Sequence, residues 1–444
     1  MTLTSHRQAG IHERPAQLLQ ELIRFDTTNP PGNEVECIKY VDALLIGAGI
    51  ETNLIFKDPN RPNVVSRLKG EGAAPPLLLY GHADVVTTAG QQWTHPPFEG
   101  RIVDGFVWGR GALDMKGGVA MMLAAFLRAK AEGFRPAGDI ILAVLSDEEA
   151  GGDFGARYLV ENHAHLFTGT RYAIGEFGGF SMPIGGETFY PIQIGEKQVC
   201  WMKATMRGPA GHGSHPIRGG AMATLGRLLV QLNELRLPVR ITPVPRLMIE
   251  AMASVLPFPQ GLILRRVLNP RLTDRLLKRL GHGGQFFEPM LRNTVSATVV
   301  RGGEKINVIP SEVTLELDGR LVPGCVPEDL IAELKPILGD DTEIEVLRYE
   351  PGPGDPDMGL FETLADTIRA AEPGSRPLPF MLTGCTDARF FYRLGIQTYG
   401  FMPMKLPEDF QFTRAIHAAD ERIPVDSVIF GSNLMFNLLQ SYRG

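Results

Sequence analysis

The sequence of 444 residues predicts an α/β protein in which a larger domain is interrupted by a smaller α+β domain. Short apolar runs at 77–80 (LLLY) and 140–145 (IILAVL) are bounded by turn residues, a pattern typical of strands buried on both faces of a sheet. Between them, the apolar positions of 119–127 recur at helical spacing. Strand, helix and strand in this order indicate a parallel βαβ unit.

The smaller domain is indicated by a change of pattern near residue 195. Residues 194–216 combine an alternating strand with a turn rich in Gly and Pro, and 313–323 form a second alternating strand. Alternation favours an antiparallel sheet with one solvated face. A linker rich in Pro and Gly follows near residue 351, and helices and apolar strands then return. We therefore predict a large domain in two parts, 1–194 and 351–444, and an inserted domain at 195–350.

A long stretch at about 240–295, inside the inserted domain, is rich in Pro, Arg and Leu. Its core, ILRRVLNPRLTDRLLKRL, is locally basic. We expect an amphipathic surface helix or cap with a solvated basic face. A weaker alternative is that the cations attract a substrate carboxylate. The cations are Arg265, Arg266, Arg271, Arg275, Lys278 and Arg279.

Composition excludes several classes of protein. Hydrophobic residues make up 44% and charged residues 21% of the chain, as in ordinary soluble proteins. The net charge of −6 argues against binding to nucleic acid or to an anionic membrane, because both need a basic face. Four scattered cysteines are too few for a disulfide framework. The N-terminus has no signal-peptide pattern and no run of about 18 apolar residues exists, so we expect a cytoplasmic protein.

Acidic and imidazole side chains follow the predicted strands. His82 and Asp84 come directly after the first apolar run, and Asp114 opens the helix. Glu148 and Glu149 follow the second run, and a further short apolar stretch ends at Glu176. Because ligand sites in open α/β sheets lie at the carboxyl ends of the strands, we expect these groups to meet in one crevice.

Carboxylates crowded in a cleft need a cation to neutralise them. An imidazole among carboxylates suits a divalent metal such as zinc. Asp84 could orient the His82 ring. One of Glu148 and Glu149 could bind metal while the other takes a proton from a metal-bound water. Each motif alone is common, since acids favour the first turn of any helix. Their joint order is specific, with 32, 35 and 27 residues separating His82, Asp114, Glu149 and Glu176.

Other catalytic motifs are missing. The pair His12-Glu13 is followed by Ala16 where the HExxH motif needs a second histidine. The sequence contains no GxSxG elbow. It also lacks a phosphate loop and a GxGxxG turn after a strand. A nucleotide-dependent oxidoreductase therefore has no support.

Six segments together resemble the M20 metallopeptidase family: YGHADVV, WGRGALDMKGG, LSDEEAGG, GPAGHGSHP, GGEKINVIP and TGCTDARFF. That family contains dizinc aminoacylases, acetylornithine deacetylases, succinyl-diaminopimelate desuccinylases and glutamate carboxypeptidases. The resemblance runs from 27–34 to 416–424, and the insertion is similar to the longer, carboxypeptidase-S-like branch. It implies a zinc-exopeptidase-like catalytic domain with a central mixed, mostly parallel sheet, interrupted by a smaller α+β lid or dimerisation domain.

The resemblance also implies site residues. His82 and Glu176 would bind one zinc ion, Glu149 and His417 the other, and Asp114 both. Glu148 would be the general base for the bridging water, Asp84 would orient His82, and His212 would stabilise the oxyanion. Co²⁺ or Mn²⁺ could replace either zinc ion. The substrate side would be lined by Asn307, Arg320 and Gly384.

The implied function is hydrolysis of an amide bond in an N-acyl amino acid or a short peptide with a free carboxylate. The alternative is a non-catalytic metal-binding protein that keeps the fold. Nucleic acid and membrane are not expected partners, whereas a homodimer through the inserted domain is possible. The acyl group, the amino acid, the physiological metal and the role of 240–295 stay open, as does whether His212 acts within its own subunit.

Overall fold

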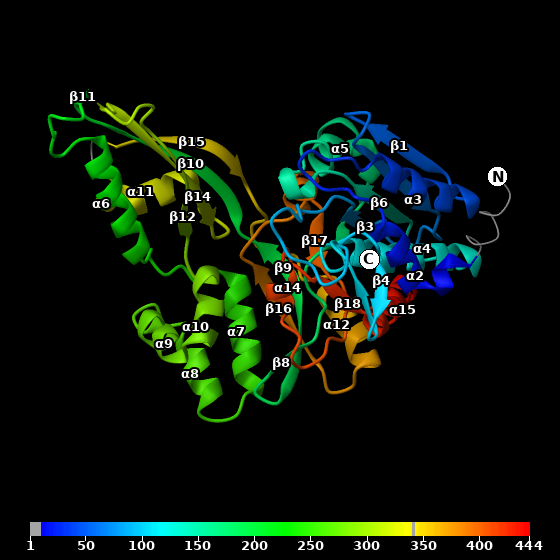
Figure 1. The fold of residues 1–444 in the computed structure, drawn as a ribbon. Coiled ribbons are helices and arrows are strands. Elements are labelled where there is room, and N and C mark those ends of the chain that lie inside the picture. The colour runs from blue at the N-terminus through cyan, green and yellow to red at the C-terminus, as the bar shows by residue number, and fades with distance from the viewer. Residues whose placement is uncertain (1–9, 340–341) are drawn as a thin grey trace. The chain divides into compact units, whose positions relative to one another are not determined.

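A computed structural model describes residues 10–339 and 342–444, which form two compact units (Figure 1). Unit 1 comprises the chain up to Ile194 together with Pro356–Phe380 and Thr386–Gly444. Unit 2 comprises Gly195–Asp355 and the short segment Met381–Cys385. Each unit therefore gathers segments that lie far apart in the sequence.

Unit 1 is built on a mixed sheet, which confirms the predicted α/β class. Its strand order is β1 (Thr52–Phe56), β2 (Pro62–Leu68), β6 (Ile140–Leu145), β3 (Leu77–His82), β7 (Tyr172–Gly175), β17 (Gln397–Gly400), β9 (Glu187–Glu196) and β16 (Arg376–Leu382), with β8 (Met182–Ile184) beside β9. The last residues of β9 and β16 belong to unit 2.

Parallel pairing is concentrated at the centre of this sheet, in β6, β3, β7 and β17. By contrast, β1 pairs antiparallel with β2, β2 with β6, and β17 with β9. Parallel neighbours need a long crossover, which the helix between β3 and β6 supplies, whereas β1 and β2 are joined by a short turn. The sheet is thus mixed, as predicted, and its parallel strands lie at the centre.

Helices cover both faces of the sheet of unit 1. Leu78 and Tyr80 of β3 pack with α5 (Ala156–Asn162) and α13 (Ala388–Phe391) in one core cluster. The other face of β3 meets α4 (Lys116–Ala131). A Cβ atom added at Gly81 would lie 2.6 Å from the Met115 side chain. A side chain at position 81 would therefore displace the end of the Met115 side chain. This packing holds the start of α4, which Asp114 precedes by two residues, against the end of β3.

The helical elements of unit 1 are η1 (Ile11–Glu13), α2 (Pro15–Ile23), α3 (Val35–Gly47), α4 (Lys116–Ala131), η2 (Glu148–Ala150), α5 (Ala156–Asn162), η3 (Ala164–Phe167), α12 (Phe361–Ala371), α13 (Ala388–Phe391), η5 (Tyr392–Leu394), α14 (Phe412–Ala415) and α15 (Val425–Ser441). A small sheet adds β18 (Arg422–Pro424), β5 (Phe106–Trp108) and β4 (Arg101–Val103).

Unit 2 contains an antiparallel sheet with the order β12 (Thr294–Arg301), β14 (Glu312–Leu321), β10 (Gln198–Arg207) and β15 (Thr342–Glu350). Helices α6 (Ala221–Glu234) and α11 (Pro327–Leu338) pack on it. Buried and part-exposed residues alternate along β14, which confirms the prediction of a half-buried strand there. A short ribbon, β11 (Gly211–His212) with β13 (Val308–Ile309), completes the strands of this unit.

The stretch 240–295 forms a group of helices in unit 2. They are α7 (Pro243–Val255), α8 (Gln260–Arg266), α9 (Thr273–Leu280), α10 (His282–Phe287) and the short η4 (Glu288–Met290). Met248, Leu264 and Leu277 bury one side of α7, α8 and α9. The amphipathic prediction for this stretch is confirmed. Within the part of the chain that the structure describes, every helix is too short or too polar to cross a membrane.

Candidate metal centre

The predicted ligand residues of unit 1 lie where its central strands end. His82 is the last residue of β3, Glu149 lies in η2 just after β6, and Glu176 directly follows β7. Asp114 precedes α4, and His417 lies between α14 and β18. Because β6, β3 and β7 are adjacent parallel strands, their carboxyl ends meet at one edge of the sheet.

These five side chains form two clusters that share Asp114. One contains His82, Asp114 and Glu176, and the other contains Asp114, Glu149 and His417. In the first, His82 Nε2 lies 3.2 Å from Asp114 Oδ1 and 3.5 Å from Glu176 Oε2. In the second, His417 Nε2 lies 3.2 Å from Asp114 Oδ2 and 3.3 Å from Glu149 Oε1. Each carboxylate oxygen of Asp114 therefore faces a different imidazole.

The electrostatics of the two clusters show an excess of negative groups. Burial and the charge of Asp114 raise the pKa of Glu149 to about 8, and burial also raises the pKa of Glu176. Hydrogen bonds to Asp114 and Glu149 raise the pKa of His417 to about 10. Burial would raise the pKa of Asp114, but hydrogen bonds from His417 and His82 hold it below its usual range. Crowded acids of this kind need added positive charge.

Divalent metal ions fit these donors. Each cluster offers one imidazole nitrogen and two carboxylate groups, and in each the donor atoms lie within 4.8 Å of one another. Nitrogen and oxygen donors in this mixture suit zinc and related transition metals. The residues present are therefore those that a pair of metal ions sharing one carboxylate would use.

Asp84 connects His82 to the loop after β6. Its carboxylate accepts hydrogen bonds from the backbone N–H groups of Glu148 and Glu149, both at 3.1 Å, and from Asn29 Nδ2 at 2.8 Å. The oxygen nearest to His82 Nδ1 is the backbone carbonyl of Asp84 at 2.9 Å, while its carboxylate Oδ1 is 3.5 Å away. His82 is thus oriented chiefly by the backbone of Asp84, and the carboxylate of Asp84 holds the Glu148 loop.

His212 and Asn307 lie together in unit 2. His212 is in the β11 and β13 ribbon, and Gly213 N–H donates to the Asn307 carbonyl at 2.9 Å. The imidazole of His212 is exposed, and its Nδ1 lies 2.7 Å from Ser214 Oγ. The sequence-predicted pair therefore shares one exposed turn.

Arg320 lies at the other end of the unit 2 sheet. It is near the end of β14, where its guanidinium bonds Asp318 and lies 3.3 Å from Cys385 Sγ, next to Gly384. Strand β14 begins at Glu312, close to the ribbon that carries His212, because Gly208 N–H bonds the Ser311 carbonyl. Eight residue steps of about 3.3 Å give roughly 26 Å between the two ends. One copy of unit 2 therefore keeps Arg320 far from Asn307 and His212.

Comparison with known proteins identifies the family. The sequence profile of peptidase family M20/M25/M40 matches residues 78–441. The chain belongs to this family. The probable carboxypeptidase S-like 2 of Dictyostelium discoideum is 30% identical over 369 residues, covering 79% of this chain and 68% of that protein. The human N-fatty-acyl-amino acid synthase/hydrolase PM20D1 is 28% identical over 382 residues, covering 82% and 74%.

The fold agrees with this family. The M20 family metallo-carboxypeptidase Sso-CP2 from Sulfolobus solfataricus superposes with a TM-score of 0.71 at 19% identity, covering 97% of this chain and 99% of that one. The predicted resemblance to the M20 family, close to its carboxypeptidase-S-like branch, is confirmed. The chain is therefore an M20 hydrolase of the metallopeptidase type.

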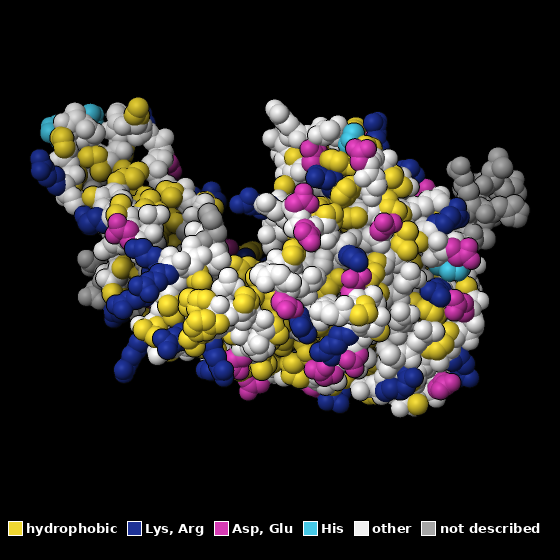
Figure 2. Space-filling model, turned by 90° about the horizontal axis from the view of Figure 1, so that it is seen from below, with side chains coloured by type: hydrophobic (Ala, Val, Ile, Leu, Met, Phe, Trp, Pro, Cys, Tyr) yellow, Lys and Arg dark blue, Asp and Glu magenta, His cyan; other side chains and the backbone are white. Residues whose placement is uncertain are grey.

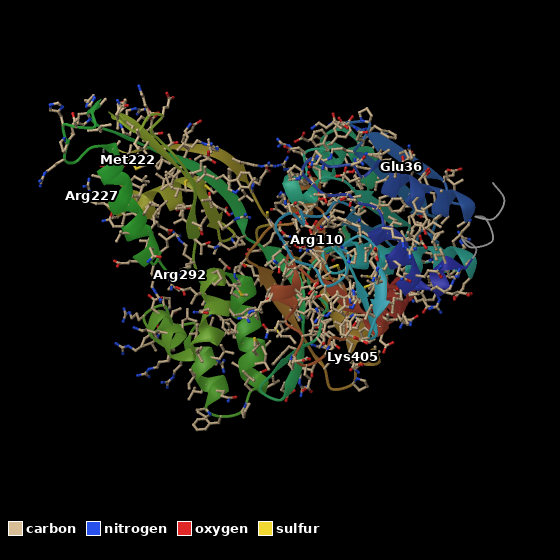
Figure 3. The ribbon with its side chains drawn as sticks, in the orientation of Figure 1. Glu36, Arg110, Met222, Arg227, Arg292 and Lys405 are labelled. Carbon is tan, nitrogen blue, oxygen red and sulfur yellow. The ribbon has the colours of Figure 1, made fainter. Side chains whose placement is uncertain are left out.

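Sequence reasoning missed the pair Arg110 and Glu421, which supports both clusters of this M20 site. Glu421 is fully buried and accepts hydrogen bonds from the backbone N–H groups of Leu113, at 2.7 Å, and Asp114, at 3.2 Å. Arg110 lies inside unit 1 (Figure 3), bonds Glu421 at 2.5 Å and donates to the His417 carbonyl at 3.2 Å. One buried ion pair thus fixes the loops of Asp114 and His417. The sequence did contain a clue to Glu421, because this residue lies only four positions after the predicted ligand His417.

Arg389 and Asp387, from the TGCTDARFF segment, were also missed. The buried guanidinium of Arg389 lies 3.7 Å from Glu148 Oε1 and donates to the Gly151 carbonyl at 3.1 Å. Asp387 is buried, and burial and the charge of Glu148 raise its pKa well above the usual range. The same segment that the sequence assigned to the substrate side therefore also positions the predicted base.

Unusual backbone conformations occur in the loops that carry the predicted ligands. Five non-glycine residues among those described have positive φ, and four of them lie beside the clusters: Asp147 (75°), Phe177 (65°), His417 (61°) and Asp420 (61°). Such conformations disfavour most side chains by about 1–3 kcal/mol and tend to persist at functional sites. The loops that carry the predicted ligands are thus held in shapes that their sequences alone disfavour.

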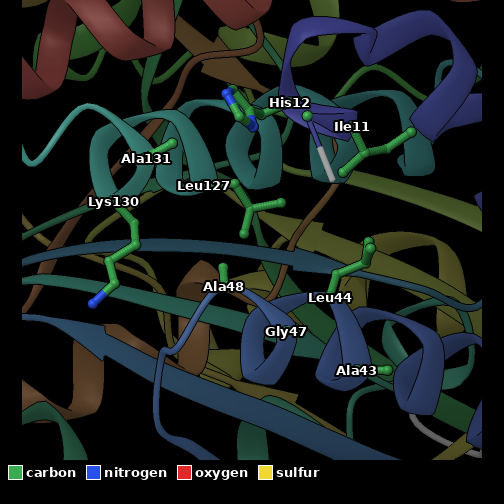
Figure 4. Close-up of a pocket in the computed structure, with 10 residues that line it drawn as sticks. Ile11, His12, Ala43, Leu44, Gly47, Ala48, Leu127, Lys130 and Ala131 are labelled. Carbon is green, nitrogen blue, oxygen red and sulfur yellow. The ribbon is translucent and has the colours of Figure 1, made fainter. Parts of the chain in front are cut away.

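Unit 1 also contains a cavity that is not part of the candidate metal centre. A cavity of about 400 Å³ is lined by residues of η1, α3 and α4, with Ile11, Leu44 and Leu127 among its apolar walls (Figure 4). Lys130 and His12 are its ionisable lining residues. None of the sequence-predicted site residues lines it, so it gives no support to a role in hydrolysis.

Proposed function

We propose that this chain is a dizinc hydrolase that cleaves the amide bond of an N-acyl amino acid or a short peptide with a free carboxylate. The observation that carries the proposal is the pair of His and carboxylate clusters sharing Asp114, with Glu148 in the adjoining loop. His82 and Glu176 would hold one ion, Glu149 and His417 the other, and Asp114 both. Co²⁺ or Mn²⁺ would fit the same donors.

Divalent ions held by these residues would supply Lewis-acid chemistry for the scissile carbonyl and a lowered pKa of water. The chain's own contribution is proton transfer and positioning. Glu148 has a raised pKa because of burial. It would accept a proton from the attacking water on its carboxylate and return it to the leaving amine. Asp84 would hold Glu148 in place through the backbone bonds described above.

We assign substrate contacts to unit 2. The exposed His212 would donate a hydrogen bond to the developing oxyanion, a role in which one donor supplies a large part of catalysis. Arg320 would bind the substrate carboxylate as a planar two-pronged donor, with Asn307 and Gly384 lining the same substrate. In this proposal unit 2 serves as a lid or dimerisation domain.

Arg320 and His212 lie at opposite ends of the sheet of unit 2. The two side chains of one chain are therefore too far apart to contact the same small substrate. A second copy would supply His212 and Asn307 to the site whose Arg320 comes from the first. This supports a homodimer formed through unit 2, in which each active site uses residues of both chains.

The test is amine release from a panel of N-acetyl, N-succinyl and N-fatty-acyl amino acids and dipeptides, with zinc-loaded protein. The panel includes fatty-acyl substrates because the relative PM20D1 is described as acting on them. Glu148→Gln keeps the size of the side chain and removes the base, so kcat should fall about 10²–10⁴-fold. Metal content should not change. Full turnover by a folded Glu148→Gln protein would refute the mechanism, and zinc binding without turnover of any panel member would favour a non-catalytic role.

A further inference from the structure

The helices inserted in unit 2 carry a charge opposite to that of the whole chain. Residues 256–282 contain six Lys and Arg residues and one acid, a local net charge of +5 in a protein whose net charge is −6. We call these six residues the basic face: Arg265, Arg266, Arg271, Arg275, Lys278 and Arg279. All six are exposed. The negative net charge of the whole chain argued against an anionic partner, but it conceals this strongly cationic region.

The basic face lacks internal partners. Among the described residues, none of its six side chains has a hydrogen bond or an ion pair. The single acid of this segment, Asp274, has cationic partners outside the basic face. It bonds Arg292, which is labelled in Figure 3, and lies 3.9 Å from Arg236. The cations are thus available to an external anionic surface.

Apolar side chains project from the same helices. Phe258, in the Pro257-Phe258-Pro259 turn between α7 and α8, is 85% exposed, and Leu262 is 46% exposed. On α8, Leu262, Arg265 and Arg266 stand at positions i, i+3 and i+4, so they share one helix face. Leu264 is buried on the opposite side of that helix. Figure 2 shows Lys and Arg side chains gathered beside hydrophobic ones on this part of unit 2.

We propose that the basic face and Phe258 dock unit 2 onto the surface of an anionic lipid bilayer. A cationic face beside exposed aromatic and leucine side chains is the composition of helices that lie in the membrane interface. Each cation near an anionic membrane contributes about 1 kcal/mol. An aromatic ring in the interfacial region adds apolar burial without crossing the bilayer. This contact needs no membrane-spanning helix.

Lipid is favoured over nucleic acid because of the apolar tip. Nucleic acid would use the cations but would leave Phe258 and Leu262 in water, whereas a bilayer accepts both kinds of side chain. The rest of the chain has a net charge of −11, the difference between −6 and +5, and is repelled by anionic lipid. Docking is therefore restricted to the basic face, and it should weaken as salt shortens the Debye length.

The test is sedimentation of the full-length protein with vesicles of phosphatidylcholine alone or with 30% phosphatidylglycerol added. The expected result is binding to the anionic vesicles only, weaker at high salt. The double variant Arg265→Glu and Arg266→Glu changes the charge by four units and should lower partitioning at least about a hundredfold. Phe258→Ala should lower it about fivefold, since it removes apolar contact and no charge.

The matched control is Arg227→Glu with Lys335→Glu. Both residues are exposed on helices of unit 2 outside the inserted helices, and the charge change is the same. This control should bind vesicles like the unchanged protein. The proposal is overturned if the unchanged protein binds no vesicles at millimolar lipid, or if control and basic-face variants lose binding equally. Binding to RNA that exceeds binding to vesicles and does not depend on Phe258 would also overturn it.

Discussion

The two regions that carry predicted site residues are built in opposite ways. In unit 1, His82, Asp84 and Glu176 are buried, and the loops around them are held by buried polar groups. In unit 2, His212 is exposed on a two-residue ribbon whose nearest side-chain partner is Ser214. The first region is organised before substrate or metal arrives, whereas the second offers one donor at the tip of a turn.

The difference follows from the chemistry proposed for each region. Crowded carboxylates stay close only if surrounding bonds fix them, because they repel one another. A donor that meets the substrate must remain accessible and gains its partner only on binding. Substitutions in the two regions should therefore differ in kind: those of the predicted ligands in unit 1 should remove metal and activity together, and those of the substrate contacts in unit 2 should remove activity alone.

The largest effect is expected for Asp114→Asn. This change leaves the side-chain volume almost unaltered but removes the charge that both clusters share. Bound metal should fall by at least half. The value of kcat/KM should fall by more than about 10³-fold, well beyond the 10–100-fold that is typical when an outer partner of a metal ligand is lost. Elemental analysis and amine-release kinetics measure the two quantities. As a control, Asp366→Asn on the exposed face of α12 should retain both. Full metal content in Asp114→Asn would refute the shared-ligand assignment.

A smaller effect is expected for His212→Ala. Loss of one oxyanion donor lowers kcat about 10²–10³-fold, and bound metal should stay unchanged because His212 belongs to neither cluster. Kinetics and metal analysis on the same sample separate this outcome from that of Asp114→Asn. His215→Ala, three residues away in the same turn, is the matched control.

The same variant tests whether His212 acts across a dimer. Mixing His212→Ala protein with Glu148→Gln protein should restore part of the activity if each site combines residues of two chains. Two inactive variants that stay inactive after subunit exchange would show that His212 serves its own chain.

The sequence was a good guide wherever local pattern decides structure. The apolar runs 77–80 and 140–145 became the central strands β3 and β6, and the alternating stretch 313–323 became β14. His82, Asp114 and Glu149 could be expected to converge because the carboxyl ends of parallel strands meet at one edge. Their geometry agrees with that expectation, and their roles as ligands remain predictions for the metal analysis above.

Long-range partners could not be predicted in the same way. The bond between Glu421 and the Asp114 backbone joins residues 307 positions apart, and no spacing rule indicates it. Likewise, nothing local separates Arg320 from His212, since both lie in strands of one domain. Only the strand register, which pairs Arg207 with Glu312 and Val199 with Arg320, places them at opposite ends of the sheet. Such pairings depend on the whole fold and not on any one segment.

Arg389→Lys should have an intermediate effect within unit 1. Lysine keeps the positive charge near Glu148 but lacks the planar fork that also bonds the Gly151 and Thr386 carbonyls. We expect kcat to fall about tenfold while KM and metal content stay unchanged, because the base would be less well positioned. Arg393→Lys, four residues later and paired with Glu161, is the control and should match the unchanged protein. Equal kcat values for the two variants would exclude a positioning role for Arg389.

The smallest expected effect is on the free energy of unfolding and comes from Lys197, a buried charge of unit 2. The acids of unit 1 can be neutralised by metal. By contrast, among the residues that the structure describes, the buried Lys197 of unit 2 bonds two neutral groups only, the Arg292 carbonyl and Thr294 Oγ1. Burial and the neighbouring Arg320 lower its pKa to about 7. Between this value and the ordinary lysine value of 10.5, the unfolded chain binds more protons than the folded one. Unfolding free energy should therefore rise with pH in that window, by about 2 kcal/mol from pH 7 to pH 9.

Lys197→Met isolates this contribution. It fills a similar volume without a titratable group, so its unfolding free energy should lack the rise between pH 7 and pH 9 that the unchanged protein shows. Urea unfolding of metal-loaded protein at pH 7, 8 and 9 gives the comparison. The control is Lys203→Met, because Lys203 lies nearby on β10, is partly exposed and pairs with Glu345. If the two variants follow the same pH dependence, Lys197 is fully protonated at pH 9. Its burial would then be offset by polar contacts stronger than the two described.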